Sequence, residues 1–388
     1  MITPRPRPRP KAGQEAVVPI TATAATEHCM EIRQRGPVPL TGAVTRIALW
    51  LAGLHGASGP HGPATVAARE KGKKSMNLDR RIREAETRLF ARGGLQPQES
   101  FLDLAAARVR LRVLAVGAGP PLVMLHGVSL AAAVWAPWLA DLTGYRALLV
   151  ELPGHGLSGP VAYRPGAVRD HTVRLMDDLF EALELSTAPV VGHSLGGMFA
   201  LWYAAARPGR IASLVAIGDP AVALPGATVR MPLSLLTVPV LGGAVLRTPM
   251  PRPVYRGLLG QGLSPAAAAA APDDLLDVLR LAGHRNGNAR TVASLMHAID
   301  GFRRPRPDSV MTDGELGRIT VPTMFCWGTE DPFLTPARAR ASIAKIPGAA
   351  LHEVPGGHGP WLEDSAGCAK LAADHFTATG FAPACSPP

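Results

Sequence analysis

Short apolar runs alternate with amphipathic stretches from about residue 98 to residue 220 of the 388-residue chain. The run "PPLVMLHG" at 120–127 ends in glycine, as does "APVVG" at 188–192, and apolar segments of this length bounded by turn residues are typical of buried strands. Between them, residues 130–142 are helix-like. The stretch "RDHTVRLMDDLFEAL" at 169–183 repeats its apolar residues at intervals of three and four, which predicts an amphipathic helix. This alternation predicts a mostly parallel, doubly wound α/β sheet with helices on both faces.

The alternation stops after "IASLVAIGD" (211–219) and resumes with "VPTMFCWGTED" (321–331) and "ALHEVPGGHG" (350–359). Helical stretches near 272–282 and 288–300 lie in the gap. Some hundred residues, as a rough count, are too many for a loop inside a compact domain. We therefore expect an inserted helical cap over the strand ends, where open α/β sheets bind their ligands.

The N-terminal segment 1–75 differs in character from the rest. It contains the low-complexity run "RPRPRPK", which cannot form a core, and we expect it to be disordered, with Met76 as the functional start. Its apolar run "IALWLAGL" is too short to span a bilayer, and it lies too far from the N-terminus for a signal peptide unless translation begins at Met30. The predicted divisions are the extension 1–75, the two parts of the core at 76–219 and 317–378, the cap at 220–316 and a flexible tail at 379–388.

The formal charge of +10 is concentrated in the same segment. Residues 1–75 hold 11 Lys or Arg against 4 Glu, whereas the remaining residues hold 29 basic and 26 acidic side chains. A body with so small an excess of positive charge and 5% aromatic residues offers no basic patch, so we exclude nucleic acid as a partner.

The four cysteines are Cys29, Cys326, Cys368 and Cys385, and no two of them have C-x-x-C spacing. This arrangement favours neither a disulfide framework nor a zinc site. We therefore expect a reducing compartment, the cytoplasm, and no metal.

The stretch "GHSLGG" at 192–197 lies where a strand pattern changes to a helical one. A serine at such a junction, between Gly192 and Gly196, fits a sharp strand–turn–helix elbow that exposes the hydroxyl near the positive end of a helix. Glycine and serine that merely cap a helix would give the same letters, so the strand before the motif and the helix after it carry the argument. We predict that Ser194 is a nucleophile.

A serine hydroxyl needs a base, and the base works best when an acid orients it. Asp331 in "WGTEDPF" follows a predicted strand and precedes a proline, and His358 in "GGHG" lies on a glycine-rich loop suited to reaching into a site. The order Ser194, Asp331, His358 is the one expected for a sheet of this type. Asp219 in "IGDP", at the end of an earlier strand, is the alternative acid.

Negative charge that develops on a substrate oxygen needs hydrogen-bond donors. The predicted donors are the backbone N–H groups of Leu195, directly after the nucleophile, and of Val128, in the loop after "VMLHG". In that loop Gly127 would permit the turn, and His126 would hold the loop in place. The alternative is that His126 acts as a second base. This chemistry requires no cofactor.

These motifs together resemble the α/β-hydrolase superfamily over roughly residues 100–378. The resemblance implies the α/β-hydrolase fold with a helical cap, Ser194 as nucleophile, Asp331 as acid and His358 as base. Glu151 departs from the usual pattern, because aspartate is commoner there, and we expect the change to affect loop structure rather than chemistry. The motifs that carry the resemblance are "HG" at 126–127, "ELPGHGLS" at 151–158, "GHSLGG" at 192–197, "WGTEDPF" at 327–333 and "GGHGPW" at 356–361.

The leading functional hypothesis is a cofactor-free serine hydrolase that cleaves a carboxylic ester through an acyl-enzyme. The apolar cap indicates a small-molecule substrate with an apolar acyl or aromatic group. A serine at position 194 argues against the epoxide hydrolases and dehalogenases of the superfamily, which attack with a carboxylate. Hydrolysis of a carbon–carbon bond in ring-cleavage products uses the same triad and is the main enzymatic alternative, and a non-catalytic binding module is the alternative of another class. We expect no membrane association, and the oligomeric state leaves no pattern in the sequence.

Overall fold

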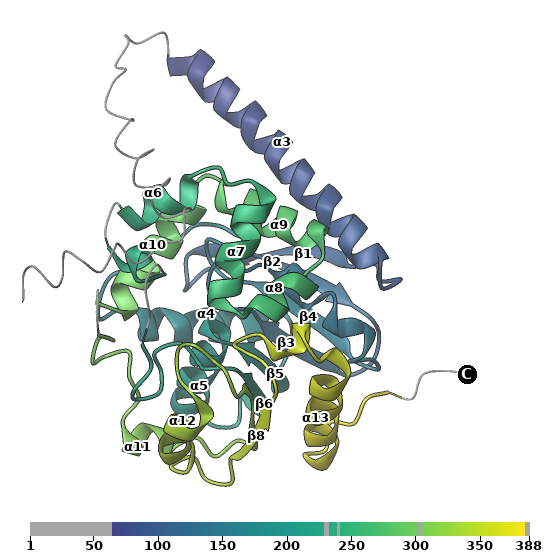
Figure 1. Cartoon of the computed structure of the whole chain (residues 1–388), viewed down its shortest axis with the longest axis vertical. Coiled ribbons are helices and arrows are strands. Elements are labelled where there is room, and N and C mark those ends of the chain that lie inside the picture. Colours follow the sequence, from purple (N-terminus) through teal and green to yellow (C-terminus); the bar gives the residue numbers. More distant parts are fainter. Residues whose placement is uncertain (1–63, 229–232, 239–240, 302–303, 385–388) are drawn as a thin grey trace, which may run out of the picture. The chain divides into compact units, whose positions relative to one another are not determined.

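The computed structural model describes residues 64–228, 233–238, 241–301 and 304–384 (Figure 1). The disorder expected for residues 1–63, the start at Met30 and the last residues of the tail therefore lie outside the described residues. Within them, eight strands form one sheet in the order β1-β2-β4-β3-β5-β6-β7-β8. The strands are β1 (Gln98–Leu104), β2 (Val109–Val116), β3 (Pro121–Leu125), β4 (Arg146–Glu151), β5 (Ala188–His193), β6 (Ile211–Ile217), β7 (Thr323–Gly328) and β8 (Ala350–Val354).

The sheet is mostly parallel, as the sequence predicts. Strands β3 to β8 pair in parallel, and β2 joins the edge as the antiparallel partner of both β1 and β4. The alternation of apolar residues with arginines in "RVRLRV" predicts a half-exposed hairpin. β1 and β2 do pair as an antiparallel hairpin, but in β2 only Arg110 is exposed and Arg112 is buried. All carboxyl ends of the parallel strands consequently meet at one edge, where ligands bind in sheets of this kind.

Helices cover both faces of the sheet and fill the long connection between β6 and β7 (Figure 1). No helix within the described ranges is long and apolar enough to cross a membrane. The α-helices are α3 (Ala64–Ala91), α4 (Val168–Ala182), α5 (Leu195–Ala206), α6 (Leu241–Arg247), α7 (Arg252–Gly262), α8 (Pro265–Ala270), α9 (Asp273–Gly283), α10 (Asn288–Ile299), α11 (Asp313–Leu316), α12 (Pro336–Ile343) and α13 (Ser365–Ala378). The 3₁₀ segments are η1 (Ala132–Trp135), η2 (Trp138–Ala140), η3 (Leu233–Thr237) and η4 (Pro360–Leu362).

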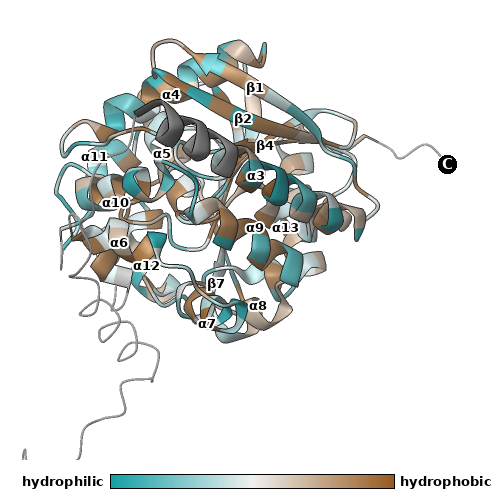
Figure 2. Ribbon diagram, turned by 90° about the horizontal axis from the view of Figure 1, so that it is seen from above, coloured by the Kyte–Doolittle hydropathy of each residue, from teal (hydrophilic) through white to brown (hydrophobic). Residues whose placement is uncertain are grey.

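Two hydrophobic cores form because successive side chains of each strand point to opposite faces. On one face, Val123 and Leu125 of β3 pack in a cluster with α4, α5 and α12. On the other face, Leu122 and Met124 of the same strand pack with α3, η1, η2 and α13. Figure 2 shows hydrophobic colour along the strands and alternating teal and brown on the helices, as expected for amphipathic elements.

Residues 130–142, which the sequence pattern predicts to be helical, form η1 and η2 rather than an α-helix. Pro137 separates the two segments, since proline has no N–H to donate and its ring crowds the preceding turn. The indoles of Trp135 and Trp138 pack against each other with a centroid distance of 5.6 Å, and both are buried.

Helix α3 begins at Ala64 and not at Met76, so the predicted boundary at residue 75 falls inside a helix. The segment "AAREKGKKS" is rich in Ala, Arg, Glu and Lys, whose high helix propensity lets the helix extend toward the N-terminus. Arg92, just beyond its end, holds Asp274 of α9 at 2.8 Å. From residue 75 onward, where side chains are described, the buried apolar side chains of α3 are Ile82, Ala85, Leu89 and Phe90.

A buried ion cluster, here called the anchor cluster (Glu86, Arg112 and Glu151), joins α3 to β2 and β4. The guanidinium of Arg112 donates two hydrogen bonds to the Glu86 carboxylate, at 2.9 and 2.7 Å, and lies 3.4 Å from Glu151 Oε1. Glu151 Oε2 accepts the N–H of Leu157 at 2.6 Å, and Glu99 of β1 lies 2.6 Å from Arg112 Nε. The expectation that Glu151 affects loop structure agrees with these contacts.

The connection between β6 and β7, here called the β6–β7 insertion, contains η3 and α6 to α11. Its helices α9 and α10 match the two helical stretches predicted within 220–316. Asn288 Nδ2 of α10 donates to Gly156 O at 3.0 Å, and His358 N donates to Leu263 O at 2.7 Å. The insertion is thereby bonded to the loops that follow β4 and β8, at the carboxyl edge of the sheet.

Candidate functional site

Ser194 occupies a strained turn between β5 and α5. Its φ of 52° and ψ of −113° are unusual for a residue other than glycine, as expected for an elbow that holds a nucleophile. The turn depends on Gly196, because a Cβ built there would lie 2.2 Å from the backbone oxygen of Leu125 in β3. Ser194 is 7% exposed, and the residue that follows it, Leu195, is the first residue of α5.

Asp331 and His358 form a hydrogen-bonded pair at the ends of neighbouring strands. Asp331 Oδ2 lies 2.7 Å from His358 Nδ1, and both side chains are buried. The carboxylate is itself held by two backbone donors, the N–H of Asp219 on Oδ2 at 2.9 Å and the N–H of Phe333 on Oδ1 at 3.0 Å. An Asp bonded to Nδ1 fixes the tautomer that leaves Nε2 free to accept a proton.

The close approach of these groups requires glycine at position 218. Its φ of +64° lies in the left-handed region, and a Cβ there would be 3.0 Å from His358 Nδ1 and 3.2 Å from Asp331 Oδ2. The "IGDP" segment thus supplies both space for the pair and, through Asp219 N–H, a hydrogen bond to it.

His358 is fixed on several sides by residues that sequence reasoning left out of the site. His193, directly before Ser194, lies with Nε2 2.9 Å from the backbone oxygen of His358, and the two rings are 4.7 Å apart. Phe333 packs edge-on against the His358 ring at 4.6 Å, and Leu263 of the β6–β7 insertion accepts its N–H. The position of His193 inside the serine motif indicates that it lies near the site, whereas nothing in the sequence indicates that Leu263 contacts His358.

Asp219, the alternative acid, is buried within reach of the same carboxylate. Burial, with the nearby charge of Asp331, raises the pKa of Asp219 well above its ordinary value. Its Oδ1 has no hydrogen-bond partner among the described residues. Burial thus disfavours the charged form of the Asp219 carboxyl group, whereas the Asp331 carboxylate accepts three hydrogen bonds.

The loop after β3 carries Val128 beside the elbow, half buried. His126 in this loop is fully buried, and burial lowers its pKa to about 3. Its Nε2 accepts the N–H of Leu152 at 3.1 Å, so no lone pair is free to take a proton from substrate. The geometry supports the loop-holding role predicted for His126 and disfavours a role as second base.

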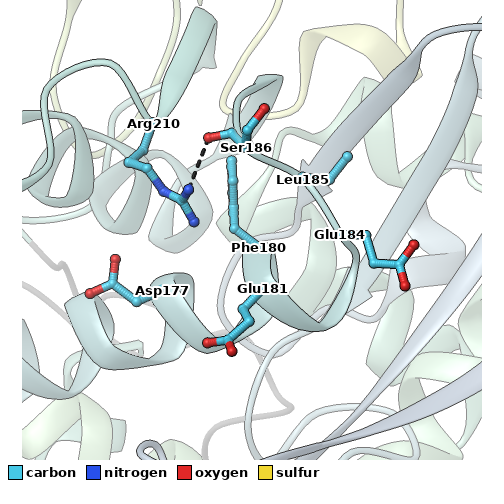
Figure 3. Close-up of a pocket in the computed structure, with 7 residues that line it drawn as sticks. All are labelled: Asp177, Phe180, Glu181, Glu184, Leu185, Ser186 and Arg210. Atoms are coloured by element: carbon cyan, nitrogen blue, oxygen red, sulfur yellow. Dashed lines mark hydrogen bonds between the residues drawn. The ribbon is translucent and has the colours of Figure 1, made fainter.

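A pocket of about 410 Å³ lies at the opposite end of β5 from Ser194 (Figure 3). Arg210 in its lining donates to Ser186 O at 2.9 Å, and the lining also includes three acidic residues. These residues precede β5 and β6, so the pocket is separate from the carboxyl edge of the sheet. In the described ranges, no group of three His, Cys, Asp or Glu residues is arranged to hold a metal ion. The pocket is lined by Asp177, Phe180, Glu181, Glu184, Leu185, Ser186 and Arg210.

Comparison with known proteins places the same features in one family. The alpha/beta hydrolase family matches residues 122–371. A 2-hydroxy-6-oxononadienedioate/2-hydroxy-6-oxononatrienedioate hydrolase of Cupriavidus pinatubonensis is 28% identical over 260 residues, which cover 61% of this chain and 79% of the relative.

Two solved structures share the fold at lower identity. Carboxylesterase CesB of Bacillus subtilis superposes with a TM-score of 0.61 at 19% identity, covering 78% of this chain and 99% of that one. The 2-hydroxy-6-oxo-6-phenylhexa-2,4-dienoate hydrolase of a Rhodococcus species superposes with a TM-score of 0.60 at 18% identity, covering 73% and 99%. The sheet order, the serine elbow and the family match lead to one conclusion: this chain is a hydrolase that belongs to the alpha/beta hydrolase family.

Proposed function

We propose that the protein is a cofactor-free serine hydrolase that cleaves a carboxylic ester. The observation that carries the proposal is the buried Asp331–His358 pair, 2.7 Å apart, whose His358 contacts His193, the residue directly before Ser194 in the strained elbow. A hydroxyl on such a turn and an imidazole oriented by a carboxylate are the parts that acyl transfer requires.

In the proposed mechanism Ser194 Oγ attacks the ester carbonyl while His358 Nε2 takes its proton. The backbone N–H groups of Val128 and Leu195 stabilise the oxyanion, and protonated His358 then gives its proton to the departing alcohol. A water molecule, deprotonated by His358, hydrolyses the acyl-enzyme and returns Ser194 to its starting state. Asp331 holds the ring of His358 through Nδ1 in each of these steps.

We propose that the β6–β7 insertion acts as a cap and that the acyl or aromatic group bound beneath it is uncharged. The half-buried arginines of the described part of the insertion already donate to protein acceptors, so they offer no free cation for a substrate carboxylate. Arg256 and Arg280 donate to Asp273 and Asp277. Arg285 donates to Asp79 and Arg306 to His297 O.

A second candidate is the hydrolysis of a carbon–carbon bond in a ring-cleavage product. The names of the relatives from Cupriavidus and Rhodococcus favour it, since both are hydrolases of 2-hydroxy-6-oxo dienoates. The same three side chains would serve, because the attacked carbonyl is a ketone and the departing group a carbanion that must be protonated. The two candidates differ in whether the substrate carries a carboxylate.

The test treats purified protein with a fluorophosphonate probe, maps the adduct by mass spectrometry and measures hydrolysis of short-chain aryl esters. We expect the label on Ser194 and a fall in turnover of about 10⁴-fold or more in Ser194→Ala, as for other nucleophile variants. Ser186→Ala, an exposed serine before β5, is the matched control and should keep both label and turnover. Folded wild-type protein that neither takes the label nor turns over an ester would contradict the proposal.

Parallel assays with a 6-phenyl dienoate and with a neutral aryl ester of similar size separate the two candidates. A kcat/KM for the ester that exceeds the value for the dienoate by about 100-fold or more, roughly 2.7 kcal/mol of discrimination, supports ester hydrolysis. The reverse ratio would make carbon–carbon bond hydrolysis the function.

We also propose that the enzyme is cytoplasmic. Cys326 and Cys368 are free thiols although their sulfur atoms lie 3.7 Å apart, which suits a reducing compartment. Alkylation of the denatured protein, taken directly from cells, should modify both residues; recovery of a disulfide between them would contradict this location.

A further inference from the structure

Two histidines bracket the loop that carries Val128. His126, after β3, lies with Nδ1 2.8 Å from the oxygen of Gly127. His155, in the loop after β4, accepts the N–H of Ser129 on its Nε2 at 3.0 Å. The rings contact each other edge to face with centroids 5.0 Å apart.

Hydrogen bonds fix the tautomer of both rings. The Nε2 atom of each accepts a backbone N–H, from Leu152 for His126 and from Ser129 for His155, so the proton lies on Nδ1. The Nδ1–H of His155 in turn donates to Pro153 O at 3.0 Å. Burial keeps both rings neutral, since it lowers the pKa of His126 to about 3 and that of His155 to about 4.

Two of these hydrogen bonds, the one from His126 to Gly127 O and the one from Ser129 N–H to His155, involve the two peptide planes that flank Val128. The oxygen of Gly127 belongs to the same peptide unit as the N–H of Val128, and the N–H of Ser129 belongs to the unit that contains the carbonyl of Val128. In a trans peptide the N–H points away from the C=O, so a bond that fixes the oxygen also fixes the direction of the N–H. Holding both planes therefore sets where the Val128 N–H points.

The backbone of Ser129 needs such a support. Its φ of 60° lies in the left-handed region, which a residue other than glycine adopts only when its surroundings impose it. The N–H of Ser129 is bonded to His155 and the N–H of Leu130 to Gly127 O at 3.3 Å. Both of these N–H groups are thus used inside the protein, and the donor that the proposed mechanism assigns to this loop is the N–H of Val128.

We infer that His155 is a positioning residue, which holds Ser129 N–H and so keeps the Val128 N–H aimed at the substrate oxyanion. His126 fixes the other side of the same donor. The inference rests on the proposed function, in which Val128 is an oxyanion donor, and it adds a residue from the "PGHG" turn that the mechanism did not use. His155 touches no reacting atom and acts through the loop alone.

The experiment compares His155→Phe, which removes the acceptor, with His155→Gln, whose Oε1 can take the place of Nε2. We expect kcat of His155→Phe to fall by about 10- to 100-fold with KM within about threefold, because a donor displaced by a fraction of an ångström is lost mainly in the transition state. An aryl boronic acid, which forms a tetrahedral adduct with the nucleophilic serine, should bind more weakly by a similar factor. His155→Gln should recover most of kcat and of the boronate affinity.

His171→Phe is the matched control, because His171 of α4 also bonds a backbone oxygen, that of Ala107 at 3.2 Å, but lies away from the loop. It should leave kcat and boronate affinity unchanged. Thermal unfolding of every variant verifies that the comparison is made on folded protein, and a folded His155→Gln keeps the test decisive if His155→Phe does not fold.

Three results would overturn the inference alone: wild-type kcat in His155→Phe, a loss of kcat without loss of boronate affinity, or a His155→Gln variant as impaired as His155→Phe. A wild-type enzyme without Ser194-dependent turnover would instead overturn the proposed function, and this inference with it. The wild-type assay therefore distinguishes the two failures.

Discussion

The carboxyl edge around Ser194 and the anchor cluster of Glu86, Arg112 and Glu151 are both rich in buried polar groups, but they use them differently. In the anchor cluster both oxygens of Glu86 and both oxygens of Glu151 have a donor. Arg112 Nε has no hydrogen bond but forms an ion pair with Glu99 Oε1 at 2.6 Å. Beside Ser194, the Nδ1 of His193 and the Oδ1 of Asp219 are buried with no partner among the described residues.

The difference shows how one fold separates anchoring from chemistry. An ion cluster whose charges are paired is costly to break, because removal of one partner leaves a buried charge without compensation. Unpartnered polar atoms cost stability, and proteins retain them where a site requires them. We therefore expect substitutions at the carboxyl edge to change catalysis more than folding, and substitutions in the anchor cluster to do the reverse.

The largest expected effect tests the catalytic side of this comparison. Asp331→Asn should lower kcat/KM by about 10³- to 10⁴-fold, because an amide no longer stabilises the protonated imidazole and favours the wrong tautomer. Asp219→Asn should change kcat/KM by only a few-fold, because Asp219 contacts Asp331 through its backbone N–H, which the substitution keeps. Steady-state ester hydrolysis measures both, and a larger loss in Asp219→Asn would make Asp219 the acid.

The next effect is on stability. Arg112→Met leaves Glu86 and Glu151 buried without their cation and should reduce the free energy of unfolding by about 3–5 kcal/mol. Arg110→Met is the matched control on the same strand, since the Arg110 side chain is 62% exposed and its loss should change the free energy by less than about 0.5 kcal/mol. Urea unfolding gives both values. If Arg112→Met has the same kcat per folded molecule as wild type, the anchor cluster affects folding alone. A lower kcat per folded molecule would show that the cluster also affects catalysis.

A smaller effect is expected at His193. His193→Phe keeps an aromatic ring but removes the donor to the His358 oxygen, and the loss of one hydrogen bond of about 1 kcal/mol corresponds to a fall in kcat/KM of about fivefold. His193→Gln can place a donor near the position of Nε2 and should recover part of the loss. Measurement of kcat/KM and of the unfolding midpoint for each variant shows whether His193 affects catalysis. Activity equal to wild type with a lower midpoint would assign His193 to packing alone.

A slope of stability with pH is also expected from the anchor cluster. Burial, followed by the charge of Glu86, raises the pKa of Glu151 to about 7 from an ordinary 4.5, against the opposing effect of Arg112. A carboxyl group with a raised pKa contributes stability below pH 4.5 that is lost as the pH rises through 7. Urea midpoints between pH 5 and 8 should therefore fall more steeply in wild type than in Glu151→Gln; parallel curves would refute the assignment.

Local sequence determined the elbow and the fold class. The glycines of "GHSLGG", the order of strand and helix patterns, and the positions of Asp331 and His358 on strand-end loops are properties of adjacent residues, so they can be predicted from the chain alone. Within 130–142 the pattern predicted a helix, but Pro137 interrupts it and the structure has two 3₁₀ segments. Residues close in sequence impose most of these features through backbone sterics.

Contacts between distant residues could be decided only by the tertiary structure. Two aspartates end strands in the sequence, and only the packing places Asp331 Oδ2 on His358 while leaving Asp219 to donate its N–H. The same is true of Leu263, whose backbone oxygen reaches His358, the proposed base, from the β6–β7 insertion. Sequence specifies the strand ends because they follow local rules of pleat and turn. It does not specify which side chains meet there, because that depends on how the chain buries its apolar faces.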